Sequence, residues 1–203
     1  VRPGDVPVAL AMANYMGGTF AKGSIAATIV TEALDLAPPG SRQHGQLLSR
    51  YADMLDSSVE DQNAGTAALG QALEIALSED DAAMAIEVLS KLARRHYVQL
   101  EYQQYLGSST RAIELFPRAD QPPDINVYWN AVRALIGLGC VEEARPYAAH
   151  QLELAEESGS KFVLTQALHA SGYLAFRLGD WVTARGFSNR GLELDGQDVR
   201  LLY

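Results

Sequence analysis

The sequence lacks several features that would point quickly to a function. One of its 203 residues is a cysteine, Cys140, so an internal disulfide is excluded and a reducing compartment fits. Basic residues are outnumbered 16 to 25 by acidic ones, and the net charge of -9 argues against nucleic acid or an anionic membrane as a direct partner. A secretory signal and an apolar run of membrane-spanning length are absent from the printed sequence. We therefore expect a cytoplasmic protein.

Catalytic and metal-binding patterns are also scarce. The four histidines have no ligand spacing, and no second cysteine could join them in a metal site: His44, His96, His150 and His169. The sequence shows no motif that pairs Cys140 with a general base, as a catalytic cysteine requires. We therefore interpret Cys140 as a partly buried, inert thiol. Pairs of acidic residues lie where helices are expected to begin or on polar faces. The sequence therefore predicts neither an enzyme nor a cofactor or metal site.

One stretch, "GGTFAKGS" at Gly17–Ser24, resembles a phosphate-binding loop. In a Walker A loop the last glycine precedes the lysine, after a strand and before a helix. Here Lys22 precedes Gly23, and the segment before the stretch, "PVALAMANYM", has the pattern of a helix. We interpret the stretch as the turn between two helices.

Internal repetition is the most informative feature. Five stretches share an alanine-like position followed by aliphatic, acidic and aliphatic residues: "EALDLAPP", "QALEIALS", "RAIELFPR", "HQLELAEE" and "RGLELDGQ". Their first pattern positions are Ala33, Ala72, Ala112, Gln151 and Gly191, which are 39, 40, 39 and 40 residues apart. Such regular spacing indicates a repeat protein.

Each repeat has the pattern of two helices, because apolar residues recur at steps of three and four. The pattern predicts helices over 80–97, 102–116, 162–178 and 181–194, with Pro117 and Gly179 at two of their ends. Pro38-Pro39, Pro122-Pro123 and Gly159 mark breaks between repeats. We expect an all-α, right-handed α-solenoid of about five helix-turn-helix pairs.

The expected domain organisation is one solenoid over residues 1–203. Its repeats cover approximately 1–39, 40–79, 80–121, 122–159 and 160–203. The chain begins at Val1 and stops within "DVRLLY", so we expect a fragment of a larger protein. An array cut within the stack would expose an apolar helix face, through which a homodimer could form.

The last unit, "ALHASGYLAFRLGDWVTARGFSNRGLEL", resembles a tetratricopeptide repeat. The matching positions are a small residue at the helix crossing, a turn glycine, an aromatic slot, a small packing slot and two late leucines: Gly172, Gly179, Trp181, Ala184, Leu192 and Leu194. Phe20 would fill the aromatic slot in the first repeat. Gly191, Gln151 and Ser188 depart from the pattern, and the period is longer than the roughly 34 residues of this family and approaches that of HEAT arrays.

Residues of about 80–203 also resemble the long repeats of MalT-like bacterial regulators, most clearly in "EEARPYAAHQLELAEESGSKFVLTQALHASGYLAFRLGDWVTAR". The resemblance implies a signalling ATPase module before the repeats and a LuxR-type DNA-binding domain after them. The repeats would then be a non-catalytic segment for protein interaction and effector sensing in transcription regulation. The alternative is a stand-alone scaffold or adaptor. The implied partners are a protein or peptide, an anionic small-molecule effector, or neighbouring domains of the same chain.

The resemblance to tetratricopeptide repeats places certain first-helix positions on the concave face of the solenoid. Carried over by register, the binding candidates are Arg94, Tyr97, Trp129, Arg133, His169, Tyr173 and Arg177. Further positions of the same register are Glu87, Ser90, Asn126, Gln166 and Phe176, with Arg50 and Tyr15 in the early repeats. Arginine and aromatic groups here would suit an acidic peptide, an acidic patch or an anionic metabolite. The alternative is an ordinary solvated helix face with aromatic residues packed between helices.

Overall fold

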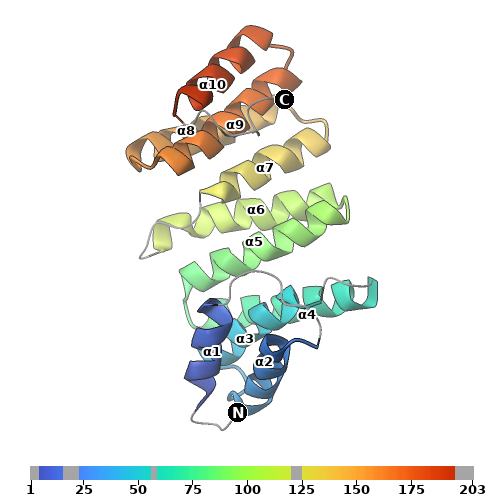
Figure 1. Cartoon of the computed structure of the whole chain (residues 1–203). Helices are drawn as coiled ribbons and strands as arrows, with labels where there is room; N and C mark the ends of the chain where they lie inside the picture. The colour runs from blue at the N-terminus through green and yellow to red at the C-terminus, as the bar shows by residue number, and fades with distance from the viewer. Residues whose placement is uncertain (1–4, 16–22, 56–58, 120–124, 195–203) are drawn as a thin grey trace. The chain divides into compact units, whose positions relative to one another are not determined.

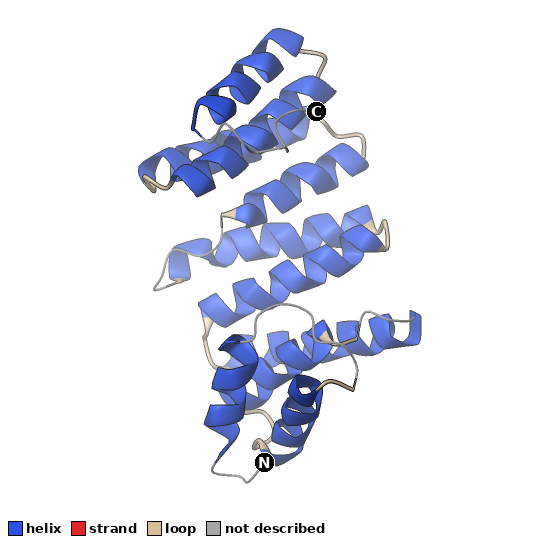
Figure 2. Ribbon diagram, viewed as in Figure 1, coloured by secondary structure: helices blue, strands red, loops and turns tan. Residues whose placement is uncertain are grey.

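The computed structural model describes residues 5–15, 23–55, 59–119 and 125–194 (Figure 1). The regular structure of these residues is entirely helical (Figure 2). The all-α class and the helical-repeat architecture expected from the sequence are therefore confirmed.

The helices of the described residues form five consecutive pairs, one for each sequence repeat. They are α1 (Val6–Tyr15), α2 (Ile25–Leu36), α3 (Arg42–Asp53), α4 (Val59–Ser78), α5 (Ala82–Val98), α6 (Tyr102–Leu115), α7 (Asn126–Gly137), α8 (Arg145–Glu157), α9 (Lys161–Arg177) and α10 (Trp181–Leu194). Short 3-10 helices cover Phe116–Arg118 and Glu142–Ala144. Pro117 thus lies just beyond α6, and Pro146 lies in the first turn of α8, where its missing N–H costs little.

Side-chain caps explain where many of these helices begin. Each capping oxygen accepts a hydrogen bond from a backbone N–H three residues later; the capping residues are Ser24, Ser41, Asp81, Ser160 and Asp180. These bonds satisfy first-turn N–H groups that have no partner within the helix. Of the stretch that resembles a phosphate loop, residues 17–22 lie outside the described residues. Gly23 has a positive φ of 85° and Ser24 caps α2, as a turn before a helix requires.

The turns that join the helices of three pairs share one hydrogen-bonded form. At the turn between α7 and α8, the Cys140 N–H bonds to the Leu135 carbonyl at 2.9 Å, and Gly139 has a φ of 79°. Gly179 occupies the same position between α9 and α10, with the same φ. In the α5–α6 turn the position is held by Leu100, whose φ is 60°. All three residues adopt the left-handed conformation that ends many helices and that favours glycine.

The helices are grouped in two compact units. The first comprises residues 1–95 and 115–122, and the second comprises residues 96–114 and 123–203. In the first unit, α1 packs on α2 and α3, and α3 packs on α4. In the second, α7 packs on α8, and α9 packs on α7, α8 and α10. The expectation of a single solenoid domain over 1–203 stays a prediction.

The repeat register is visible in the burial of equivalent positions. Ala33, Ala72, Ala112 and Gln151 are each 0% exposed, and Gly191 is also buried. All five lie on the second helix of their pair, and at four of them an alanine or glycine allows neighbouring helices to approach. The crossing expected at Gly172 is present as well, because an added Cβ there would lie 3.4 Å from the Phe187 Cβ.

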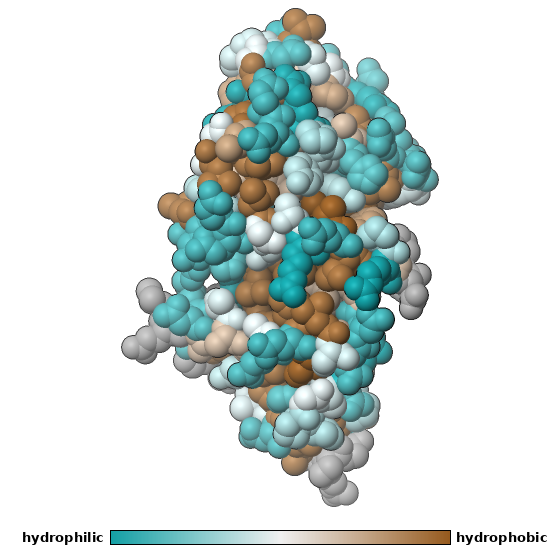
Figure 3. All heavy atoms as spheres, turned by 180° about the vertical axis from the view of Figure 1, so that it is seen from behind, coloured by the Kyte–Doolittle hydropathy of each residue, from teal (hydrophilic) through white to brown (hydrophobic). Residues whose placement is uncertain are grey.

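The face of the molecule drawn in Figure 3 carries both polar and apolar side chains. Trp181, expected to fill an aromatic packing slot, is instead 64% exposed at the start of α10. Its ring contacts the Phe176 ring edge-on, with centroids 4.8 Å apart.

None of the described helices is both long and apolar enough to cross a lipid bilayer.

Candidate functional site: a strip of arginine and aromatic side chains

The structure brings six of the seven candidate binding residues together in the second unit. We call this set the arginine–aromatic strip: Tyr97, Trp129, Arg133, His169, Tyr173 and Arg177. These residues come from the last turn of α5 and from α7 and α9, the first helices of three successive repeats. Whether the strip is the functional face stays a prediction.

Ring and cation contacts connect the strip into one row. The Arg133 guanidinium carbon lies 3.7 Å from the Tyr97 ring centroid and 5.5 Å from that of Trp129. Trp129 meets His169 and Tyr173 edge-on, at centroid distances of 5.6 and 5.7 Å. Contacts of both kinds are favourable and restrict side-chain rotation.

Arg177 extends the row along α9. Its Nη1 atom donates a hydrogen bond of 3.1 Å to the Tyr173 hydroxyl, one turn earlier. The strip therefore holds two arginine side chains and no carboxylate.

Two further hydrogen bonds fix amide side chains beside the strip. The Tyr105 hydroxyl donates to Asn130 Oδ1 at 3.0 Å, and Asn126 Nδ2 donates to Gln166 Oε1 at 3.4 Å. Asn126 and Gln166 belong to the expected concave register. Tyr105 and Asn130 were missed, because hydrogen bonds between an α6 residue and an α7 residue leave no local sequence pattern.

Burial keeps the supporting tyrosine neutral. Tyr105 is 1% exposed, and this burial raises its pKa to about 12, against the opposing effect of the positively charged Arg133. The phenol therefore does not ionise at neutral pH. It cannot act as a counter-charge for Arg133.

The remaining candidate positions lie elsewhere. Arg94 is exposed and belongs to the first unit, so the structure does not join it to the strip. Phe176 pairs with the exposed Trp181 at the α9–α10 turn. The Ser90 hydroxyl bonds to the Ile86 carbonyl of its own helix. The side chain of Tyr15 lies outside the described residues.

In the first unit, Arg50 of the expected register and the neighbouring Lys91 are paired with acids. Lys91 Nζ lies 2.8 Å from Asp53 Oδ2 and 3.2 Å from Glu87 Oε1, and it also donates to Ser49 Oγ at 2.8 Å. Arg50 lies 3.6 Å from the same Asp53 carboxylate. Sequence reasoning missed this network, although opposite charges about one repeat apart on successive first helices were a usable signal. Its charges are compensated, so it is a poor anion site.

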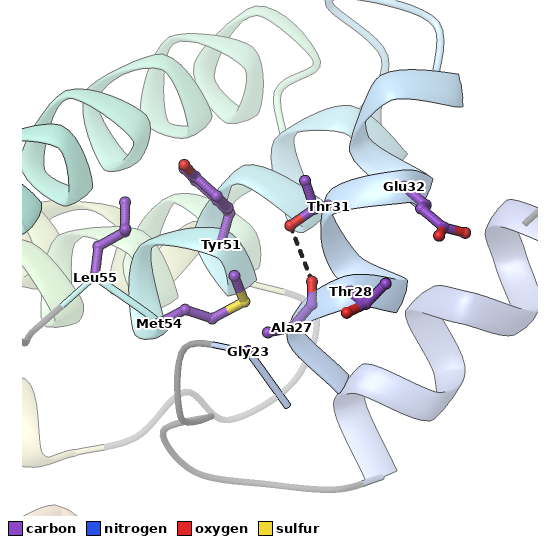
Figure 4. A pocket seen from close by; sticks show the side chains of 8 residues that line it. All are labelled: Gly23, Ala27, Thr28, Thr31, Glu32, Tyr51, Met54 and Leu55. Atoms are coloured by element: carbon purple, nitrogen blue, oxygen red, sulfur yellow. Dashed lines mark hydrogen bonds between the residues drawn. The ribbon is translucent and has the colours of Figure 1, made fainter. Parts of the chain in front are cut away.

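A pocket of about 350 Å³ opens in the first unit between α2 and the end of α3 (Figure 4). Its apolar wall includes Ala27, Met54 and Leu55, and Tyr51 lines it from α3. Glu32 lines it from α2, and none of the described residues that line it is basic. The described part of the lining therefore holds a carboxylate and apolar side chains, which do not suit the anionic effector expected from the sequence.

The described residues were also searched for a metal-binding site. No group of three or more His, Cys, Asp or Glu side chains there is placed to hold a metal ion. Cys140 is partly buried against the core cluster of α7 and α8, as expected for an inert thiol.

Comparisons with known proteins reveal the fold more than the role. No family model matches the chain, and no curated protein matches it. Among solved structures, BtubC (BKLC) from P. vanneervenii has a TM-score of 0.72 and 18% identity, over 84% of this chain and 72% of that one. Aspartyl phosphate phosphatase F from Bacillus subtilis has a TM-score of 0.73 and 17% identity, over 95% of this chain and 50% of that one. This chain thus spans half the length of the phosphatase. Both neighbours are helical-repeat proteins, and the likeness supports a tetratricopeptide-like fold.

Proposed function

We propose that this chain is a non-catalytic segment for protein interaction and effector sensing in a larger bacterial signalling protein of the cytoplasm, a MalT-like transcription regulator of the LuxR type. One observation carries the proposal. Three successive repeats place arginine and aromatic side chains in one connected row, in a chain whose net charge is -9. Arginine and aromatic side chains gathered on one face favour a binding site for a ligand over an ordinary solvent-exposed helix face.

In the proposed regulator, ligand binding at the strip would shift the conformational equilibrium of the neighbouring domains. A ligand shifts an equilibrium between two states only if it binds one of them more tightly. Because Trp129 and Tyr173 lie on different helices, a bound ligand would prefer one relative placement of α7 and α9. In the proposed regulator, that preference would be transmitted along the repeats to an ATPase module and a DNA-binding domain.

A scaffold or adaptor without an effector is the second candidate. Large apolar side chains lie exposed at the helix-pair turns of the second unit, where a protein partner could cover them: Val98 at 64%, Leu100 at 67%, Trp181 at 64% and Val182 at 84%. Such a partner would dock on the turns and leave the strip unused.

The full-length protein separates the two candidates. We would purify it, measure ATP hydrolysis and DNA binding, and repeat both with Tyr173→Ala. The regulator predicts both activities and a changed response in the variant. A full-length protein that neither hydrolyses ATP nor binds DNA would refute the regulator and leave the scaffold.

A further inference from the structure

We infer that the pocket of the first unit binds a small organic ammonium ion with an apolar body. The pocket lies between α2 and the end of α3 and shares no residue with the arginine–aromatic strip (Figure 4). The inference therefore goes beyond the proposed function and does not depend on it. A volume of about 350 Å³ falls in the range of small-molecule sites in proteins, and the lining residues indicate which chemistry fits.

The wall on the α3 side is apolar. Met54 and Leu55 line it and are 6% and 5% exposed, and Tyr51 is half-buried beside them. Ala27 adds a methyl group from α2. The flexible, polarizable thioether of a methionine adapts to irregular ligand shapes. This wall suits the alkyl or aromatic body of a ligand, because both partners then remove apolar surface from water.

Polar side chains line the pocket from α2, and they offer acceptors. Thr28 Oγ1 donates its proton to the Ser24 carbonyl at 3.3 Å. Thr31 Oγ1 donates in the same way to the Ala27 carbonyl at 2.9 Å. Because both hydroxyl protons are used within the helix, these oxygens have only lone pairs to offer a ligand. Glu32 adds a carboxylate to the same lining, so the described α2 side chains select a ligand that donates hydrogen bonds.

Charge favours a cation over a neutral donor. Ala27 lies in the first turn of α2 and Met54 caps the end of α3, so opposite ends of two helix dipoles border the pocket and largely cancel. The Glu32 carboxylate is then the charge that remains among the described lining residues. The net charge of -9 attracts cations from a distance, and a ring such as that of Tyr51 can add a cation–π contact.

Methionine methyl groups give the test a local readout. Met54 lines the pocket, whereas the Met84 methyl carbon lies against Gly45 of α3 and serves as the control within the same unit. We would label the methionine methyl groups with carbon-13 and assign the two signals from Met54→Leu and Met84→Leu. The labelled protein would be titrated with hexylammonium, 1-hexanol and hexanoate, which share a hexyl or pentyl chain and differ in charge.

We expect hexylammonium to shift the Met54 methyl signal saturably and to leave the Met84 signal unchanged. 1-Hexanol should bind about fivefold more weakly, because an ion pair open to solvent makes a modest contribution to affinity. Hexanoate has the same sign of charge as Glu32 and should produce no saturable shift.

Two variants assign the recognition. Glu32→Gln should remove the preference for hexylammonium over 1-hexanol. Glu74→Gln makes the same change at an exposed α4 position outside the pocket lining and should preserve that preference. Thr31→Phe places a ring at an exposed position of the lining and should abolish binding of both ligands. The circular dichroism spectrum and melting temperature of each variant check that it folds.

Several results would overturn the inference. Equal affinity for hexylammonium and 1-hexanol would refute cation recognition, and an unchanged preference in Glu32→Gln would refute the role of that carboxylate. A Met54 signal that does not move would refute the pocket, and tighter binding of hexanoate would assign an anion site instead. Each outcome is independent of whether the full-length protein hydrolyses ATP or binds DNA, so failure here is distinguishable from failure of the proposed function.

Discussion

At the scale of single residues, Leu100 holds a position that glycine holds in the next two repeats. Its φ of 60° lies in the left-handed region, which costs a non-glycine residue roughly 1 kcal/mol. Leu100 is also 67% exposed, so removing its side chain removes few packing contacts. We predict that Leu100→Gly raises the free energy of unfolding by about 0.5 kcal/mol.

Chemical denaturation measures this effect, and the reverse change supplies the control. Gly179→Ala at the equivalent turn should destabilise by about 1 kcal/mol, although an added Cβ meets open space there. A Leu100→Gly variant less stable than the parent would show that the leucine contributes contacts which its exposure does not suggest.

Gln151 is the residue whose burial is hardest to reconcile with its chemistry. It is 0% exposed, and neither its Oε1 nor its Nε2 atom has a hydrogen-bond partner within the described residues. Equivalent positions in the other repeats hold alanine or glycine. Since an unsatisfied buried amide costs about 1–3 kcal/mol, Gln151→Leu should stabilise the protein by about 1 kcal/mol.

The predicted gain corresponds to a rise of about 2–4 °C in melting temperature for a chain of this size. Gln151→Ala provides the comparison, because it removes the same polar atoms but leaves a cavity, and its gain should be smaller. A loss of stability in Gln151→Leu would mean that the amide has a partner such as an internal water.

Tyr105 makes stability depend on alkaline pH. Its pKa is raised by burial from 10.0 to about 12, so the folded state holds the phenolic proton more tightly than the unfolded state does. The stabilisation this provides is complete below pH 10 and is lost as pH rises toward 12. We predict that Tyr105→Phe loses less stability over this interval, as followed by circular dichroism across a pH series. Equal losses would mean that Tyr105 titrates normally.

At the scale of helices, Arg95 ties the end of α3 to α5. It is 6% exposed, and its guanidinium donates to the carbonyls of Ala52 and Leu55 at the end of α3 and to that of Gln62 on α4. A cation at a helix C-terminus also interacts favourably with the helix dipole. Sequence patterns did not single out Arg95, because its acceptors are backbone atoms.

We predict that Arg95→Met destabilises the protein by about 2–4 kcal/mol, since the carbonyls lose a charged donor while remaining buried. Arg111→Met on the exposed side of α6 is the matched control and should change stability by less than about 0.5 kcal/mol. Thermal or urea denaturation of the two variants checks the difference. Similar values for both would refute the capping role.

The helices themselves were largely predictable. The expected segments at 80–97, 102–116, 162–178 and 181–194 correspond closely to α5, α6, α9 and α10, because apolar periodicity and caps are local signals. The repeat register also predicted six residues that the structure brings together in the arginine–aromatic strip. What could not be predicted depends on contacts between helices: the Tyr105–Asn130 bond, the Lys91 network, and the exposure of Trp181.

At the scale of the whole molecule, a net charge of -9 opposes the acidic ligand that the strip would attract. The Debye length decides which effect dominates: about 30 Å at 0.01 M salt, about 8 Å at 0.15 M and about 3 Å at 1 M. At low salt an approaching ligand is repelled by the entire chain, and near physiological salt it is influenced mainly by the strip. At high salt both effects are screened.

We therefore predict that an acidic peptide, tested as oligoglutamate, binds the strip most tightly at intermediate ionic strength, and titrations followed by tryptophan fluorescence over this salt range would measure it. Binding of a basic peptide should instead weaken as salt rises, because the attractive net charge of the chain is screened first and the repulsion by the strip remains near physiological salt. A steady weakening for oligoglutamate as well would indicate that the local positive field extends further than the strip.

The shared turn geometry has a consequence for how such a chain can change its length. Leu100, Gly139 and Gly179 close their helix pairs in the same way, and they are 39 and 40 residues apart in the sequence. Each turn sets the angle at which the second helix of its pair leaves the first helix, and the first helices carry the strip. We therefore expect that an insertion or deletion that preserves this geometry comprises whole repeats of about forty residues, and that each added repeat contributes one more first helix.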